Sequence, residues 1–123
     1  MYKNYKELKV WEKSYQLCLD LYKITGGFPK DEKYGLTSQI RKTAMSVPSN
    51  IADGYGRRIT EDYIRSLCIA YGLNCELETQ IMLSGDLNYT DNNEMNGILD
   101  KTNEIGRMLK ALIKALEGKN VSS

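Results

Sequence analysis

The sequence predicts an all-α protein that folds as an up-down-up-down, antiparallel four-helix bundle. Three observations predict this fold. Apolar residues recur at alternating spacings of three and four along four long segments. No segment combines strict apolar–polar alternation with turn residues at strand spacing. The connections between the segments are short, so consecutive helices are expected to be antiparallel neighbours.

The chain has 123 residues, enough for one hydrophobic core and too few for two. We expect a single domain over residues 1–118 and a frayed C-terminal tail over residues 119–123. No apolar run approaches the ~20 residues of a membrane span, and the polar N-terminus lacks an apolar signal-peptide core. These features predict a cytoplasmic protein without a membrane partner. The three cysteines show no CxxC spacing, which predicts reduced, buried thiols.

The first helix is expected over residues 5–25, where two apolar series run along its surface. One series is typical of a bundle seam and consists of Leu8, Trp11, Tyr15, Cys18 and Tyr22. A second series widens the stripe and consists of Val10, Leu17, Leu21 and Ile24. Because this stripe covers more than half of the circumference, one bundle cannot bury all of it, and a homo-oligomer is expected.

The second helix is expected to begin near Asp31 and to continue through Pro48 to Gly54 and Gly56. Its apolar phase is carried by Leu36, Ile40, Ala44, Val47, Ile51 and Tyr55. Proline inside a helix removes one backbone donor and clashes with the carbonyl four residues earlier. Since the phase survives, we predict one continuous helix that is kinked at Pro48.

The third helix is expected from Thr60 to Gly85 and the fourth from Asp91 to Gly118. The inner face of the third is predicted to consist of Tyr63, Leu67, Ala70 or Tyr71, Asn74, Leu77, Ile81 and Ser84. The fourth carries the most regular series, which consists of Met95, Ile98, Thr102, Ile105, Leu109, Leu112 and Leu116. Both series have the spacing of helices that face a bundle core.

A polar face follows Pro48 on the second helix. Asn50, Asp53, Gly54 and Arg57 are spaced three and four apart, and Gly54 lets another backbone approach closely. Asp53 stands four residues before Arg57, which is the favourable order for an ion pair. We predict a structural or interface contact with a protein neighbour. The alternative is a solvated helix end.

The net charge of +1 conceals an asymmetry between the two halves of the chain. Residues 1–59 carry eleven Lys or Arg against six Asp or Glu, whereas residues 60–123 carry six against ten. Either the two halves pair, or the first half forms a basic face for phosphate groups. The candidate nucleic-acid contacts are Arg41, Lys42, Arg57 and Arg58.

The residue types that usually perform chemistry are missing or scattered. The chain has no histidine, which removes the commonest general base and the Glu-x-x-His pairs of di-iron bundles. The cysteines are not clustered as a zinc site requires, and there is no phosphate-binding loop. We therefore expect no catalytic residue, no metal and no cofactor, and predict that the protein is not an enzyme.

Several stretches occur together in one order: "VWEKSYQLCLDLYKIT", "FPKDEKYGLTSQIRKTAMSVPSNIADGYGR", "AYGLNCELETQIMLSGDLNY" and the final leucine series. They resemble the four-helix bundle proteins encoded in intervening sequences of bacterial 23S rRNA genes. The resemblance covers roughly residues 5–117. Its most specific parts are Phe28-Pro29-Lys30, Tyr34-Gly35-Leu36 and Pro48-x-Asn50-Ile51-Ala52.

The resemblance implies a bundle that assembles as a ring-like homo-pentamer. It also implies a relationship to the accessory proteins of diversity-generating retroelements, in which a basic pentamer binds nucleic acid and the reverse transcriptase. That branch is more basic than this chain, so binding to RNA or DNA is expected to be weak. The leading expectation is a non-enzymatic homo-oligomer whose partner is itself. The alternative is a nucleic-acid-binding accessory protein.

Overall fold

The chain forms a bundle of four long helices. A computed structural model describes residues 4–122, with side chains described through Gly118. The elements are η1 (Tyr5–Glu7), α1 (Lys9–Thr25), η2 (Lys30–Glu32), α2 (Leu36–Tyr55), α3 (Thr60–Asp86) and α4 (Asn92–Ser122), where η marks a 3-10 helix. None of the described residues belongs to a strand. The all-α prediction is confirmed.

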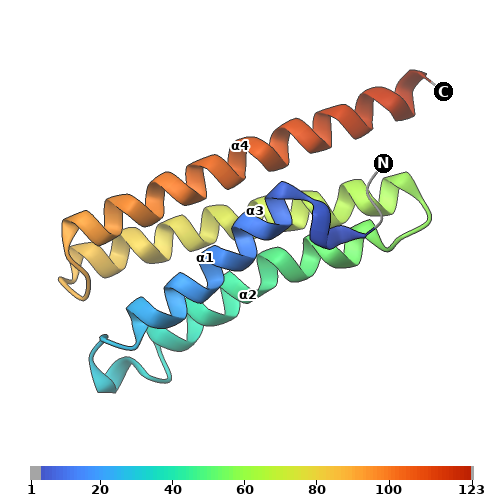
Figure 1. The fold of residues 1–123 in the computed structure, drawn as a ribbon. Helices are drawn as coiled ribbons and strands as arrows, with labels where there is room; N and C mark the ends of the chain where they lie inside the picture. The colour runs from blue at the N-terminus through green and yellow to red at the C-terminus, as the bar shows by residue number, and fades with distance from the viewer. Residues whose placement is uncertain (1–3, 123) are drawn as a thin grey trace.

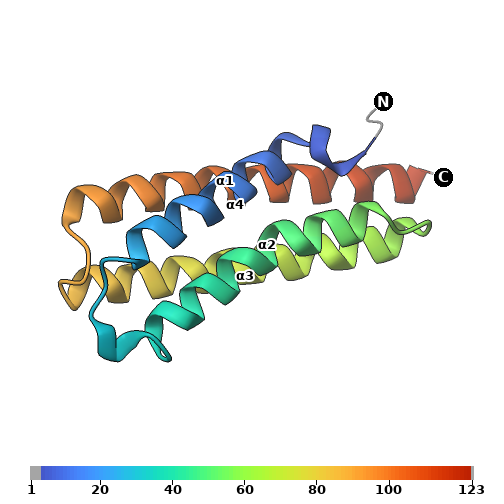
Figure 2. The same cartoon turned by 60° about the horizontal axis from the view of Figure 1, so that its bottom comes forward.

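Neighbouring helices in the chain are also neighbours in space. Each of the four α-helices packs against the next, and α1 also packs against α4, whereas the diagonal pairs make no close backbone contact within residues 4–122. Figure 1 and Figure 2 show the helices running up and down in turn, with the two ends of the chain at the same end of the bundle. This is the up-down-up-down arrangement predicted from the short connections.

The core is built from the predicted faces of α2, α3 and α4. Fully or nearly fully buried side chains on these helices are Ile40, Ala44, Val47, Ile51, Leu67, Ala70, Asn74, Leu77, Ile81, Ser84, Ile98, Thr102, Ile105 and Leu109. These side chains belong to the apolar series read from the sequence. Residues outside the series are also buried on these helices, namely Thr37, Thr43, Pro48, Gly54, Ser66 and Gly85. The last turns of α4 extend beyond α1, and there Leu112 and Leu116 are only partly buried.

The first helix turns a different face to the core than the predicted seam. The buried side chains of α1 are Val10, Ser14, Leu17, Leu21 and Thr25. In the predicted seam only Leu8 is buried, Trp11 and Cys18 are partly buried, and Tyr15 and Tyr22 are exposed. The core therefore takes the second apolar series and leaves most of the first outside. This outer series is the feature from which a function is proposed below.

Two helix starts differ from the prediction because local interactions set them. The helix expected near Asp31 begins at Leu36, whose N–H donates to the Glu32 carboxylate at 3.1 Å, so Glu32 caps α2. Residues 5–7 form η1 apart from α1, since Leu8 between them has an extended backbone (φ −73°, ψ 124°). The start of α4 is confirmed within one residue: Asp91 accepts a hydrogen bond from the Glu94 N–H at 2.8 Å.

Glycine does not end α3 or α4. Gly85 lies inside α3, and Asn88 ends that helix with a left-handed conformation (φ 62°). The Tyr89 N–H donates to the Ser84 carbonyl and the Asn88 N–H to the Gly85 carbonyl, which is a Schellman motif. Helix α4 continues past Gly118 to Ser122. The frayed tail stays a prediction, with residue 123 outside the described residues.

Helix α2 runs without interruption through Pro48, as predicted. Pro48 is buried, and Asn50 next to it donates its side-chain N–H to the Ser46 carbonyl at 2.8 Å. The Ser46 hydroxyl donates to the Lys42 carbonyl at 2.8 Å. Neither bond reaches the Ala44 carbonyl, which loses its helical N–H partner to the proline. The bend itself stays a prediction.

The expectation of three buried thiols is wrong for two of them. All three cysteines are free; Cys18 is partly buried, while Cys68 and Cys75 are exposed on α3. Burial raises the pKa of the Cys18 thiol, which keeps it protonated. The sequence signal failed because Cys68 and Cys75 occupy outer positions of α3, next to buried Leu67 and Asn74.

Two hydrogen bonds to the Glu32 carboxylate predict that the stability of the protein depends on pH. The Leu36 N–H and the Tyr89 hydroxyl, at 2.8 Å, both donate to Glu32, which lowers the pKa of Glu32 below its usual 4.5. A lowered pKa contributes stability above that usual value, and the contribution is lost as the pH falls through the folded-state pKa. Urea unfolding measures the free energy of unfolding of wild type and of Glu32→Gln. We expect the difference between the two to decrease as the pH is lowered from 7 to 3. A constant gap would contradict this.

Candidate functional site

The predicted polar face of α2 divides into a buried part and an exposed part. Gly54 is buried against α3: a Cβ added there would lie 2.6 Å from Ser66 Cβ and 3.1 Å from Tyr63 Cδ1. Such a short distance is not reached by real Cβ atoms, so only glycine fits. The close approach inferred for Gly54 therefore exists, and its partner is α3 of the same chain.

The charged members of that face lie on the surface of the chain. Arg57 donates to Asp53 at 3.1 Å, and the two side chains are 53% and 55% exposed. The ion pair predicted from the spacing of four is present. Within one chain this pair is exposed, while Gly54 faces α3, and a contact of the pair with a neighbouring subunit stays a prediction. An exposed pair of this kind contributes little to stability.

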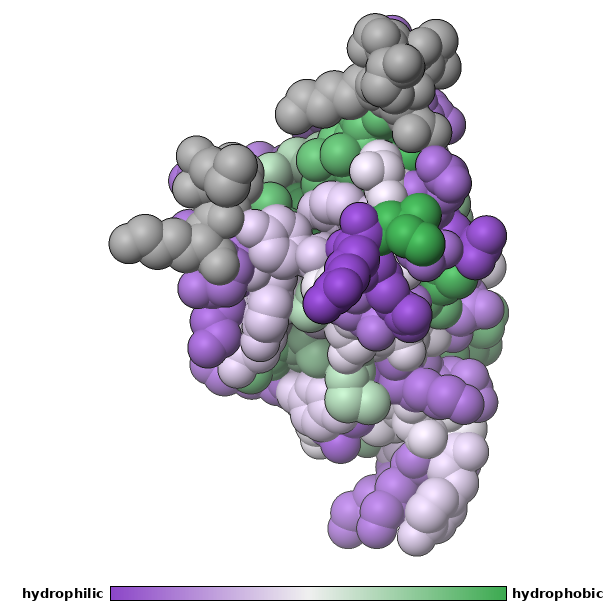
Figure 3. All heavy atoms as spheres, turned by 90° about the vertical axis from the view of Figure 1, so that its right-hand side faces the viewer, coloured by the Kyte–Doolittle hydropathy of each residue, from purple (hydrophilic) through white to green (hydrophobic). Residues whose placement is uncertain are grey.

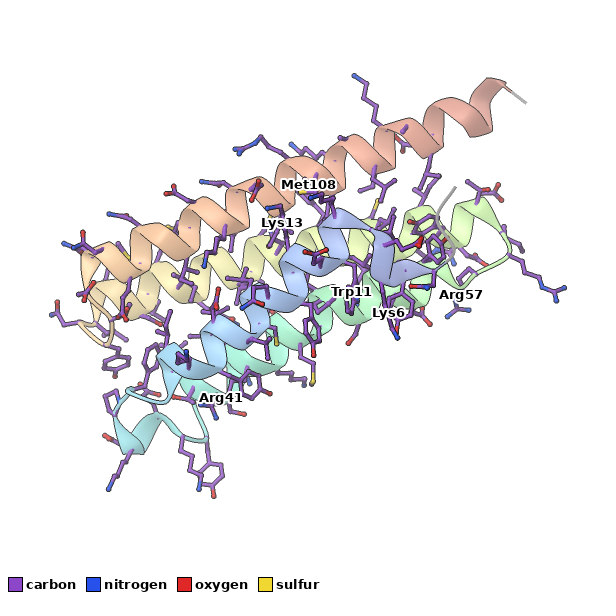
Figure 4. The ribbon with its side chains drawn as sticks, viewed as in Figure 1. Lys6, Trp11, Lys13, Arg41, Arg57 and Met108 are labelled. Atoms are coloured by element: carbon purple, nitrogen blue, oxygen red, sulfur yellow. The ribbon has the colours of Figure 1, made fainter. Side chains whose placement is uncertain are left out.

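The four candidate nucleic-acid contacts do not form one basic surface. Figure 4 shows Arg41 and Arg57 toward opposite ends of the bundle. Arg41 is engaged in structure: its Nε donates to Thr25 Oγ1 at 2.9 Å and its Nη2 to the Tyr22 carbonyl at 3.1 Å. A guanidinium at this point also opposes the negative end of the α1 dipole. Lys42 and Arg58 are exposed.

The outer side of α1 carries an apolar surface, which we call the apolar α1 face and define as Trp11, Tyr15, Cys18, Leu19 and Tyr22. Trp11 and Tyr15 stack with their ring centroids 4.9 Å apart. Tyr15 is 48%, Leu19 50% and Tyr22 41% exposed. These residues repeat at spacings of three and four, so they form one continuous strip along α1. Figure 4 shows Trp11 on the side of α1 toward α2.

The strip continues onto α2. The Arg41 guanidinium lies 4.7 Å from the centre of the Tyr22 ring, so Arg41 on α2 lies beside Tyr22 on α1. One turn further along α2 is Met45, which is 51% exposed. Because α1 and α2 are antiparallel, Met45 lies beside the middle of the apolar α1 face. By contrast, Figure 3 shows hydrophobic residues scattered among hydrophilic ones on the end of the bundle.

The sequence predicts an apolar series at these positions, but assigns the series to the seam of the bundle and not to its surface. The excess apolar width of α1 predicted that part of it stays uncovered by one bundle. Which part stays uncovered depends on the direction from which α2 and α4 approach. Two ion pairs lie on the side of α1 that faces α4: Lys101 with Asp20 at 2.8 Å and Glu104 with Lys13 at 3.2 Å.

Neither a metal site nor a membrane-spanning helix is found among the described residues. No group of three or more metal-ligating side chains is close enough together to hold a metal ion among those residues. None of the described helices combines the length and the hydropathy that a membrane span requires. The apolar α1 face is the surface considered further, because its exposed members Tyr15, Leu19 and Tyr22 repeat at spacings of three and four along one helix.

Comparison with known proteins agrees with this architecture. The family model of the 23S rRNA-intervening sequence protein matches residues 6–111. Among solved structures, the chain is similar to a protein with unknown function from the S23 ribosomal protein family of Bacteroides thetaiotaomicron. The two are 23% identical, the match covers 85% of this chain and 98% of the other, and the TM-score is 0.77. No match is found among curated proteins.

Proposed function

Since the chain belongs to the 23S rRNA-intervening sequence protein family, we propose that it works as a non-enzymatic, homo-oligomeric helical scaffold in the cytoplasm. The observation that carries this proposal is the apolar α1 face. The partner it takes is a second copy of the chain. The resemblance described above implies five copies.

The exposure and the composition of the apolar α1 face support self-association. Tyr15, Leu19 and Tyr22 are each more than two fifths exposed in the single chain. Burial of large apolar side chains in an interface contributes about 25 cal/mol for each Å² removed from water. Aromatic side chains and methionine are also enriched at protein interfaces, whereas this strip carries no charged residue of its own. A contiguous strip of this kind is typical of an interaction site.

The tryptophan on this face tests the proposal without a substitution. Trp11 is the only tryptophan of the chain and is partly buried before assembly. Assembly through the apolar α1 face should bury it further. On dilution we expect red-shifted emission and stronger acrylamide quenching, in step with a fall in the mass seen by light scattering. A falling mass with unchanged Trp11 emission and quenching would place the interface elsewhere.

The second candidate function is nucleic-acid binding, which is favoured by the exposed side chains of Lys42, Arg57 and Arg58. It is opposed by the separation of the basic residues and by the use of Arg41 in structure. A pI near 7.6 also gives a lone subunit little general attraction for phosphate. We therefore expect weak binding that falls with rising salt.

Two variants separate the candidates. Asp53→Ala should lower the free energy of unfolding by less than ~1 kcal/mol, since the pair with Arg57 is exposed. If α2 binds nucleic acid, the same change removes a repelling charge and strengthens RNA binding, whereas Arg57→Ala weakens it and flattens its salt dependence. For a scaffold, RNA affinity measured by fluorescence anisotropy should be feeble in wild type and in both variants. Tight wild-type binding that responds in opposite directions would favour the second candidate.

A further inference from the structure

A cavity with a basic lining lies where the turn between α1 and α2 meets the two helices. Its volume is about 370 Å³, within the range of about 300–1,000 Å³ typical of pockets for small molecules. The last residues of α1 form one wall, and the rest of the lining consists of Phe28, Pro29, Lys30 and Lys33 from the turn and Thr37 and Arg41 from α2. The lining thus contains three cationic side chains and no carboxylate of the described residues.

The two lysines lie on the same side of the turn. They flank η2 (Lys30–Glu32), one turn of 3-10 helix that the Lys33 N–H closes by donating to the Lys30 carbonyl at 3.1 Å. Because a 3-10 helix has three residues per turn, side chains at positions i and i+3 point the same way. Both lysines accordingly line the cavity, whereas Asp31 and Glu32 between them do not.

Arg41 supplies the third cation, which two hydrogen bonds hold in place at this end of the bundle (Figure 4). Its Nε donates to Thr25 and its Nη2 to the Tyr22 carbonyl, so its Nη1 is left without a hydrogen-bond partner among the described residues. None of the three cations forms an ion pair with a carboxylate of those residues. Three unpaired positive charges at one cavity repel each other, and an anion bound there relieves the repulsion.

Thr37 adds a hydroxyl that has no partner in the fold. The residue is 7% exposed and lies four positions before Arg41, on the same face of α2. Its hydroxyl forms no hydrogen bond within the described residues. It still keeps some accessible surface, because the fully buried side-chain atoms without a partner in that part of the chain are Asn74 Oδ1 and Gln80 Oε1. The Thr37 hydroxyl is therefore available as a donor to a ligand in the cavity that it lines.

We propose that this cavity binds a small phosphate monoester. The phosphate oxygens accept hydrogen bonds from Lys30, Lys33, Arg41 Nη1 and the Thr37 hydroxyl, and the organic part of the ligand packs against the apolar side chains of the turn. A phosphate monoester carries close to two negative charges at pH 7, so it offsets three cations better than a carboxylate or a phosphodiester, which carries only one.

Three variants test the assignment. Lys33→Gln removes one cation from the lining. Its matched control is Lys42→Gln, because Lys42 is also exposed but lies outside the cavity, and both changes lower the net charge by one. Thr37→Val removes the hydroxyl and keeps the size of the side chain. None of the three side-chain groups removed forms a hydrogen bond within the described residues, so each variant retains the fold.

The experiment measures heats of binding and shifts in Tm with phenyl phosphate and glycerol phosphate at constant ionic strength, with benzoate as the singly charged control. We expect at least one monoester to bind wild type and Lys42→Gln with equal affinity and to raise their Tm, while benzoate does neither. Lys33→Gln should weaken the binding by about tenfold and Thr37→Val by a smaller factor, since a hydrogen bond to a charged group contributes about 1.5–3 kcal/mol. A single-stranded oligonucleotide without terminal phosphates should not displace the monoester.

Four results would overturn the proposal. The first is that neither monoester binds, and the second is that benzoate binds as well as the monoesters. The third is that Lys33→Gln binds as tightly as Lys42→Gln, or Thr37→Val as tightly as wild type. The fourth is displacement of the monoester by the oligonucleotide, which would assign the cavity to nucleic acid.

Discussion

Lysine in place of Leu19 is expected to dissociate the oligomer. Leu19 is half exposed on the apolar α1 face, so Leu19→Lys leaves the fold of the single chain intact. In the assembly, the same change places an unpaired ammonium in a desolvated interface on every subunit, which is costly for a buried charge. Light scattering at micromolar concentration should show the mass falling from that of the oligomer to 14.0 kDa.

The matched control for this variant is Leu83→Lys. Leu83 on α3 is 48% exposed, nearly the same as Leu19, and lies away from the apolar α1 face. Its replacement should leave the mass unchanged. Dissociation by Leu83→Lys and not by Leu19→Lys would move the interface to α3. Circular dichroism of both variants verifies that each remains helical.

Leucine in place of Gly54 is expected to lower the free energy of unfolding by ~1–3 kcal/mol. A Cβ at this position would already lie 2.6 Å from Ser66 Cβ, and the rest of a leucine side chain would force α2 away from α3. The packing of α2 on α3 is the largest of the bundle, so a local separation is felt along both helices. Urea unfolding monitored by circular dichroism measures the change.

Gly72 provides the control for Gly54, because a Cβ at Gly72 on α3 would meet nothing within 4 Å. Gly72→Leu should leave the protein equally stable or make it more stable, since leucine forms helix better than glycine. If Gly54→Leu were as stable as Gly72→Leu, Gly54 would be no more than a residue near a helix end. The inference that α3 leaves no room for a side chain at Gly54 would then be wrong.

The inner faces of α3 and α4 could be read from the sequence because on each helix one series runs at spacings of three and four along almost the whole length. Where one series runs at spacings of three and four, only one face is available for burial. Helix α1 carries two series, and the sequence alone does not say which of them α2 and α4 cover. The ion pairs that orient α1 join residues more than eighty positions apart, as with Asp20 and Lys101. Such partners are not visible in local spacing.

Local patterns also misplaced several helix ends. Gly85 and Gly118 are expected to stop their helices, but both lie inside them, and Asn88 with its positive φ follows the end of α3. The start of α2 depends on Glu32, whose second carboxylate oxygen is held by Tyr89, fifty-seven residues away. The cap and its support come from different parts of the chain.

The candidate site also combines features that spacing within one helix predicts with features that it does not predict. The i,i+4 pair of Asp53 and Arg57 and the crowding at Gly54 follow from spacing within one helix, and both are present. The role of Arg41 does not follow from spacing within its own helix, because its partners Thr25 and Tyr22 lie on the preceding helix. A basic residue counted as a candidate nucleic-acid contact therefore holds two helices together.

The mass of the intact wild-type protein in solution tests the central claim most directly. Native mass spectrometry combined with light scattering at micromolar concentration should give a whole multiple of 14.0 kDa greater than one. The resemblance to pentameric relatives predicts five times 14.0 kDa, or about 70 kDa. A dimer would agree with an uncovered apolar α1 face and contradict the pentamer. A mass of 14.0 kDa at these concentrations would contradict the proposed homo-oligomeric scaffold itself.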